Sequence, residues 1–126
     1  MNKEGNLKEK FKQALNSTVK VISEDYKTNI NDNTNSKNIN FFELDNLNSK
    51  NDFIRFRAEA DSEALKKKFS NKEIYQNNLP NNSSYQSLYE ISEKIRYELL
   101  GSKMLKGISK NLSENYNQKF TFKRKN

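Results

Sequence analysis

The apolar residues between Leu88 and Leu112 do not fall on one face of a straight helix. Before Gly101 they are Leu88, Ile91, Ile95 and Leu99, and after it they are Met104, Leu105, Ile108 and Leu112. At roughly 3.6 residues per turn, the second set is rotated from the first by more than about a third of a turn. We therefore predict that a long helix, from about Tyr85 to Asn115, either bends near Gly101 or packs its second half on a different surface.

Two glycines lie inside this helical segment. Each costs a helix interior about 1 kcal/mol relative to alanine, so each needs a reason. Gly107 falls on the side of Leu100 and Met104, where a missing side chain would let another backbone approach closely. The alternative is that one of the glycines ends a helix and leaves two shorter ones.

Two earlier segments also have helical periodicity. Apolar residues recur at three- and four-residue steps from about Leu7 to Ser23 and from about Lys50 to Phe69. Further on, Pro80 interrupts the pattern, and Ser83 or Ser84 can cap the helix that follows.

The segment between the first two helices is rich in asparagine. Ile30, Ile39, Phe41 and Phe42 flank its polar middle, which predicts a short β-hairpin over about residues 26–44, with a plain linker as the alternative. The predicted fold is a mainly α, small helical domain of three to four helices, with this hairpin between the first two. At 126 residues the chain has room for a single core.

The composition excludes most catalytic chemistry. The chain has no histidine and no cysteine, which rules out disulfides, thiolate or imidazole metal sites and nucleophile–histidine pairs. Glu59 and Glu63 are spaced to share a cation, but Lys66 and Lys67 follow them, which is typical of a solvated helix face. We therefore predict a binding or scaffold domain without catalytic, cofactor-binding or metal-binding residues of its own.

The basic charge does not by itself indicate nucleic acid. The net charge is +7, yet only four of the 23 positive residues are arginines, the residue type that best makes bidentate contacts with phosphate or guanine. The N-terminus lacks the apolar stretch of a signal peptide, and no apolar run approaches the roughly 18 residues of a membrane span. A cytoplasmic location, away from the membrane, is the expectation.

Several spaced residues resemble a known family. The pattern R-x-E-x-x-G-[SA]-x-x-M-x-G-[VI]-x-x-N-L, which begins at Arg96, is similar to the N-terminal region of CobT, a subunit of the aerobic cobaltochelatase. The segment from Arg57 resembles the family's R-G-x-A-D-x-x-A-L, although Ala58 stands where the family has glycine, and a family histidine near Ser70 is missing. We take as signature residues, and as candidate interface residues, Arg57, Asp61, Arg96, Glu98, Gly101, Met104, Gly107 and Asn111.

The resemblance implies a non-catalytic part of a ligase that forms metal–nitrogen bonds. CobT-like subunits assist the ATP-dependent insertion of Co(II) into hydrogenobyrinic acid a,c-diamide during cobalamin biosynthesis. The implied partners are a CobS-like AAA+ subunit and a CobN-like large subunit in a hetero-oligomer, and ATP, Mg²⁺ and Co²⁺ would belong to the whole complex. The alternative function is a small basic nucleic-acid-binding or structural helical protein.

The resemblance also implies a domain organisation. Residues 1–116 correspond to the CobT-like N-terminal helical domain, and residues 117–126 form a basic tail that we expect to be frayed. Family members continue into an acidic linker and a von Willebrand A-like domain. The expectation is therefore that the chain is truncated before these parts.

Overall fold

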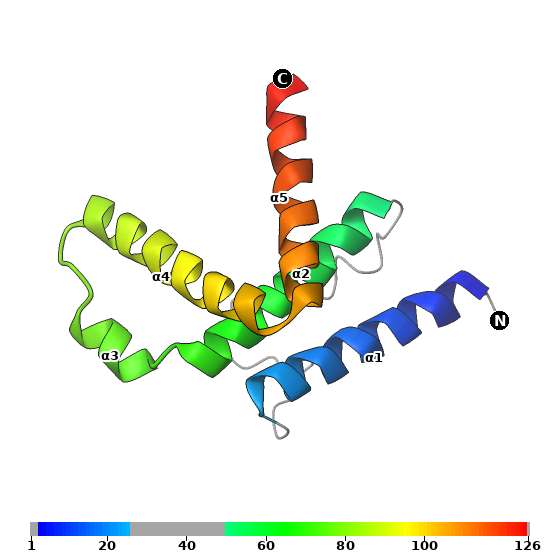
Figure 1. The fold of residues 1–126 in the computed structure, drawn as a ribbon, viewed down its shortest axis with the longest axis horizontal. Coiled ribbons are helices and arrows are strands. Elements are labelled where there is room, and N and C mark those ends of the chain that lie inside the picture. Colours follow the sequence, from blue (N-terminus) through cyan, green and yellow to red (C-terminus); the bar gives the residue numbers. More distant parts are fainter. Residues whose placement is uncertain (1–2, 26–49, 126) are drawn as a thin grey trace.

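The computed structural model describes residues 3–25 and 50–125, and these residues are almost entirely helical (Figure 1). The helices are α1 (Lys3–Ser23), α2 (Lys50–Phe69), α3 (Lys72–Asn77), α4 (Ser83–Met104) and α5 (Lys106–Lys125). None of the described helices is both long enough and apolar enough to cross a membrane.

The predicted β-hairpin is wrong. The described part of the chain contains five helices and no strand, so it is mainly α and holds no hairpin. The segment in which the hairpin was expected, about residues 26–44, lies outside the described residues.

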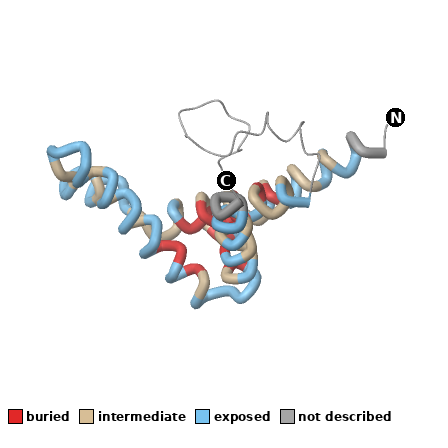
Figure 2. The backbone as a smooth tube through the Cα atoms, turned by 90° about the horizontal axis from the view of Figure 1, so that it is seen from above, coloured by how far each residue is buried: buried red, intermediate tan, exposed pale blue. Residues whose placement is uncertain are grey.

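Helix α2 is the centre of the domain. Helices α1, α4 and α5 each pack against α2, and α4 and α5 also pack against each other (Figure 1). Buried residues gather where these helices meet, whereas the first half of α4 extends away from the junction (Figure 2). The core residues are Leu15, Val19, Ile22, Phe56, Ala58, Ala60, Ala64, Leu65, Tyr97, Ile108 and Leu112.

The buried face of α2 combines two large side chains with small ones between them. Phe56 and Leu65 fill the core, and burying each contributes about 1.5–3 kcal/mol. Ala60 and Ala64 are fully buried and leave room for the neighbouring helices to approach. Phe53 extends this contact towards α1, where its ring meets that of Phe11 edge to face with 4.8 Å between centroids.

Asparagines cap the N-termini of α3 and α4. The side chain of Asn71 accepts a hydrogen bond from the backbone N–H of Ile74 at the start of α3. Asn82 accepts from the backbone N–H of Ser84 at 2.8 Å at the start of α4, so the cap is Asn82 rather than Ser83 or Ser84. An asparagine oxygen satisfies these free N–H groups as well as a serine does.

A single residue separates α4 from α5, so the prediction of one helix from about Tyr85 to Asn115 is wrong. Leu105 has extended backbone angles, φ −137° and ψ 125°. Its N–H donates to the carbonyl of Gly101 at 3.0 Å, and its carbonyl accepts from the N–H of Ser109 at 3.3 Å. Leu105 therefore ends one helix and begins the next, and we call this connection the elbow.

The elbow explains why the apolar residues after Gly101 lie on a different face from those before it. After it, Ile108 and Leu112 are buried in the core, as a change of packing surface requires. Before it, α4 buries Tyr97, Glu98 and Gly101, while Leu88, Ile91, Ile95 and Leu99 remain exposed. Neither glycine ends a helix: Gly101 lies inside α4, and the break comes four residues later. Helix α5 continues to Lys125, where a frayed tail was expected.

Candidate functional site

The candidate site is the junction of α2, α4 and α5, where most of the signature residues meet. Arg57 and Asp61 come from α2, Arg96, Glu98 and Gly101 from α4, and Asn111 from α5. Met104 and Gly107 lie on either side of the elbow and are exposed. The structure thus brings six of the eight signature residues into contacts between helices and leaves two on the surface.

Gly101 allows α4 to approach α2 closely. A Cβ atom placed on Gly101 would overlap both Cδ atoms of Leu65 and would lie 2.8 Å from its Cγ. Leu65 is completely buried, so its side chain has little room to move away. This packing explains why a helix interior accepts a glycine here.

Gly107 does not share this role within the domain. Apart from its neighbours in the chain and the backbone of its own helix, no atom lies within 4 Å of a Cβ placed on it. The close backbone approach predicted at Gly107 is therefore not found inside the described part of the chain. This glycine instead leaves the surface of the first turn of α5 open.

Asn111 bridges two charged residues of α2. Its Oδ1 accepts from Arg57 Nη2 at 2.9 Å, and its Nδ2 donates to Asp61 Oδ2 at 2.8 Å. Arg57 and Asp61 are four residues apart and hence on one face of the helix, so a single side chain of α5 reaches both. Burial raises the pKa of Asp61, although the hydrogen bond from Asn111 and the charge of Arg57 oppose the rise.

Glu98 links all three helices from a buried position. Its Oε1 accepts from Ser62 Oγ of α2 at 2.7 Å, and its Oε2 accepts from the Tyr116 hydroxyl of α5 at 2.7 Å. A buried carboxylate is tolerated when its oxygens receive such hydrogen bonds. Burial, together with this bond to Glu98, raises the pKa of Tyr116 well above its usual range.

Arg96 holds the end of α2. Its Nη2 donates to the carbonyl of Phe69, the last residue of α2, at 2.8 Å, and it pairs with Glu93 at 2.6 Å. Ser70 Oγ also donates to Glu93, at 2.6 Å. A cation placed at a helix C-terminus interacts favourably with the unpaired carbonyls there. The hydrogen bond from Arg96 lowers the pKa of Glu93.

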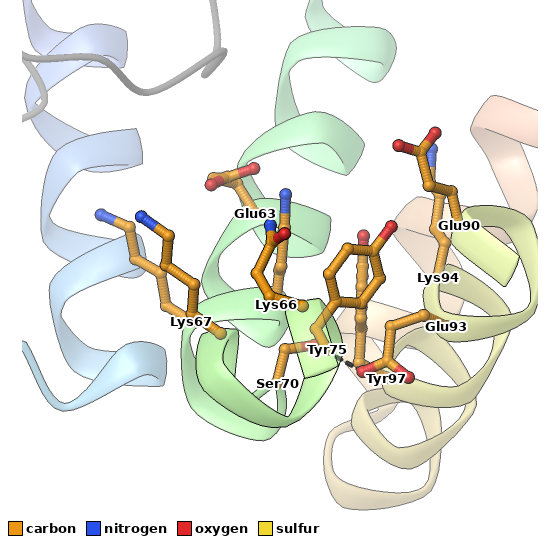
Figure 3. Close-up of a pocket in the computed structure, with 11 residues that line it drawn as sticks. Glu63, Lys66, Lys67, Ser70, Tyr75, Glu90, Glu93, Lys94 and Tyr97 are labelled. Atoms are coloured by element: carbon orange, nitrogen blue, oxygen red, sulfur yellow. Dashed lines mark hydrogen bonds between the residues drawn. The ribbon is translucent and has the colours of Figure 1, made fainter. Parts of the chain in front are cut away.

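A mixed-charge pocket adjoins this end of α2 (Figure 3). It has a volume of about 580 Å³ and is lined by the end of α2, by α3 and by α4. Its lining includes Lys66, Lys67, Lys72 and Lys94 together with Glu63, Glu90 and Glu93. Sequence reasoning missed this pocket, because α3 was not predicted and its lining comes from three separate segments.

The chemistry of the junction is structural. The two oxygens of Glu98 and the two amide atoms of Asn111 are used in contacts between helices. In the described part of the chain, no group of three or more acidic residues is placed to hold a metal ion. The signature residues of the junction therefore fix the orientation of α4 and α5 relative to α2.

The comparisons with known proteins agree with the resemblance read from the sequence. Residues 6–126 match the model of a family described as cobalamin biosynthesis protein CobT. No curated protein and no solved structure matches the chain significantly. The family match covers α4, the elbow and α5, which carry most of the signature residues.

Proposed function

Because the chain belongs to the CobT family and so takes part in cobalamin biosynthesis, we propose that it is a protein-interaction domain of a cobaltochelatase. In this proposal the domain assists the ATP-dependent insertion of Co(II) into hydrogenobyrinic acid a,c-diamide. Its own contribution is contact with other subunits, and the metal is the cargo of the complex.

The observation that carries the proposal is the use of the signature residues at the junction. Arg57, Asp61, Glu98 and Asn111 direct their polar atoms at one another or at neighbouring helices. Side chains used in this way hold the three helices in a fixed arrangement, and a binding surface requires a fixed arrangement. The exposed Met104 and Gly107 are then available at the elbow for contact with a partner.

The proposal divides the work among subunits. A CobS-like AAA+ subunit would bind ATP and Mg²⁺, and a CobN-like large subunit would insert Co²⁺ into the ring. The present domain would join them in a hetero-oligomer. Its surface carries an excess of positive charge, which favours a partner with acidic residues.

Co-purification tests the proposal directly. The tagged chain is expressed with a CobS-like and a CobN-like subunit, and the retained proteins are measured after washing at moderate salt. We expect the AAA+ subunit to be retained, and less of it with Asn111→Ala, which loosens the junction. Failure of wild-type protein to retain either subunit would contradict the proposal.

A further inference from the structure

We infer that the outer face of α4 is a docking surface for an amphipathic helix of another protein, one that carries acidic residues near one end. The surface is the row formed by Leu88, Ile91, Ile95 and Leu99, which we call the α4 row. Lysines follow its C-terminal end in the chain, at the end of α4 and the start of α5. The inference rests on the proposed function in one respect, because it assumes that the domain acts by contacting another protein.

The α4 row is apolar and open to solvent. Its four side chains are 60%, 56%, 53% and 57% exposed, in order along the chain. The residues that α4 buries are Tyr97, Glu98 and Gly101, on a different side of the helix. Single exposed leucines are ordinary, but a continuous row of them is typical of an interaction site.

The geometry of the row suits a helix. Its members follow at steps of three, four and four residues, so they form one stripe over about three turns, roughly 16 Å long. Such a stripe matches the i, i+3, i+4 and i+7 side chains of a second helix laid along it. The row contains neither tryptophan nor phenylalanine, which helices that lie on a membrane surface commonly use, and the aromatic residue next to it is the exposed Tyr85, one turn before Leu88.

The charges around the elbow indicate which helix would bind. Lys103 lies one turn beyond Leu99, and Lys106 and Lys110 follow on α5, all of them exposed. Glu98 is the last acidic residue before Glu114, and its two oxygens are already bonded to Ser62 and Tyr116. The end of the row is therefore basic and would attract acidic side chains.

A second copy of this chain fits the row less well. If two α4 helices paired in parallel, Lys103 would face Lys103. If they paired in antiparallel fashion about the middle of the row, Lys103 would face the first turn of α4, which has no acidic residue. The partner that complements these lysines is thus a different protein.

The test uses synthetic amphipathic helices and the full chain. Each peptide has one leucine row at the spacing of the α4 row, and a cluster of glutamates at either its first or its last turn. A matched peptide has lysines in place of the glutamates. Binding is measured by fluorescence anisotropy. We expect one glutamate peptide to bind and the lysine peptide to bind much more weakly.

Two kinds of variant locate the binding. The double change Ile91→Ser and Ile95→Ser should weaken binding by more than about tenfold, because two apolar contacts are lost. The control Val21→Ser and Phe120→Ser removes apolar side chains that are exposed elsewhere, at 62% and 59%, and should leave binding unchanged. Lys103→Glu with Lys106→Glu should reverse the preference between the glutamate and lysine peptides, and it does so without touching the apolar row.

Several outcomes would overturn the inference. They are no binding of either glutamate peptide, equal weakening by the row and control variants, or an unchanged peptide preference after charge reversal. Row-dependent binding to anionic phosphatidylglycerol vesicles without peptide binding would assign the face to a membrane. A dimer in sedimentation equilibrium that the row variant dissociates, again without peptide binding, would assign it to a second copy.

The two proposals fail separately. If the peptides do not bind but the CobS-like subunit is still retained, the docking inference falls and the proposed function stands. If a glutamate peptide binds the α4 row but neither chelatase subunit is retained, the proposed function falls and the docking surface stands.

Discussion

Gly101 of α4 packs directly on the side chain of Leu65 of α2, and a methyl group on Gly101 would overlap both Cδ atoms of that leucine. Leu65 is completely buried. The distance between two helices is therefore set by a missing side chain on one of them. Gly107, six residues later, faces open space, which makes the two glycines a natural pair for experiment.

Gly101→Ala is expected to destabilise the domain, and Gly107→Ala to stabilise it. Alanine gains up to about 1 kcal/mol over glycine in a helix interior. The gain is smaller in the first turn of α5, where Gly107 lies, but no contact opposes it there. At Gly101 overpacking against Leu65 costs about 1–3 kcal/mol, which exceeds the gain. Urea unfolding followed by circular dichroism measures both free energies.

A second change identifies the cause at Gly101. Shortening the opposing side chain, in the double variant Gly101→Ala with Leu65→Val, should cost less than the sum of the two single changes, because the overlap is relieved. Additive costs, or a stabilising Gly101→Ala, would show that the contact with Leu65 does not limit this position.

Asn111→Ala is expected to lower the free energy of unfolding by about 1–3 kcal/mol. The change leaves the buried carboxylate of Asp61 without its donor and the guanidinium of Arg57 without its acceptor. Asn117→Ala on the exposed side of α5 is the matched control and should have little effect. Equal unfolding free energies for the two variants would mean that the Asn111 bridge contributes nothing.

The helices in which apolar residues recur at three- and four-residue steps could be predicted from the sequence. The predicted span from Lys50 to Phe69 is the observed α2, and α1 ends at Ser23 as expected. Both signals are local, because they rest on the three- and four-residue recurrence of apolar residues. The six-residue α3 is too short to show such a recurrence and was missed.

The elbow could be anticipated only in part. The change of apolar face near Gly101 showed that one straight helix could not pack the apolar residues of both halves on the same surface. It did not locate the break, since Leu105 is a good helix former and has no local signal for an extended conformation. The position depends on how Ile108 and Leu112 reach the core, which is a property of the assembled helices.

The members of the junction were identified from the sequence, but their contacts were not. Asn111 and Asp61 were both named as signature residues, yet they are 50 residues apart, and their hydrogen bond exists only once α5 lies on α2. A bend near Gly101 was one of the two alternatives predicted there, and the structure shows that Gly101 packs closely on Leu65. The resemblance named these residues, whereas their contacts follow from the fold.

Asp61→Asn should gain stability relative to wild type as the pH rises from about 4 to about 7. Burial raises the pKa of Asp61 above the value of 3.8 that it has when exposed. Between the unfolded and the folded pKa the folded protein holds a proton that the unfolded chain has lost, so the wild-type free energy of unfolding falls as the pH rises through that interval. Asparagine does not ionise and still offers an oxygen to Asn111.

The measurement is urea unfolding of both proteins across this pH range. Glu59→Gln, on the same helix, controls for the loss of one negative charge. A difference between Asp61→Asn and wild type that stays constant with pH would show that burial does not disfavour the ionised Asp61 in the folded state.

Tyr116→Phe should make the domain less stable at neutral pH but less sensitive to alkali. Burial raises the pKa of Tyr97 to about 12, and it raises that of Tyr116 further, helped by the hydrogen bond to Glu98. Above the ordinary tyrosine pKa of about 10, the unfolded chain loses protons that the folded protein keeps, so the free energy of unfolding falls as the pH rises. Replacing Tyr116 removes one of these protons.

At neutral pH the same change takes a donor from the buried Glu98 and should cost about 1–3 kcal/mol. Unfolding is measured at neutral pH and between about pH 9 and about pH 11, with Tyr85→Phe, at a residue that is 62% exposed, as the matched control. The expected result is a shallower decline for Tyr116→Phe than for wild type or the control. If all three decline in parallel, the hydroxyl of Tyr116 is not held protonated by the junction, and the bond to Glu98 does not contribute as described.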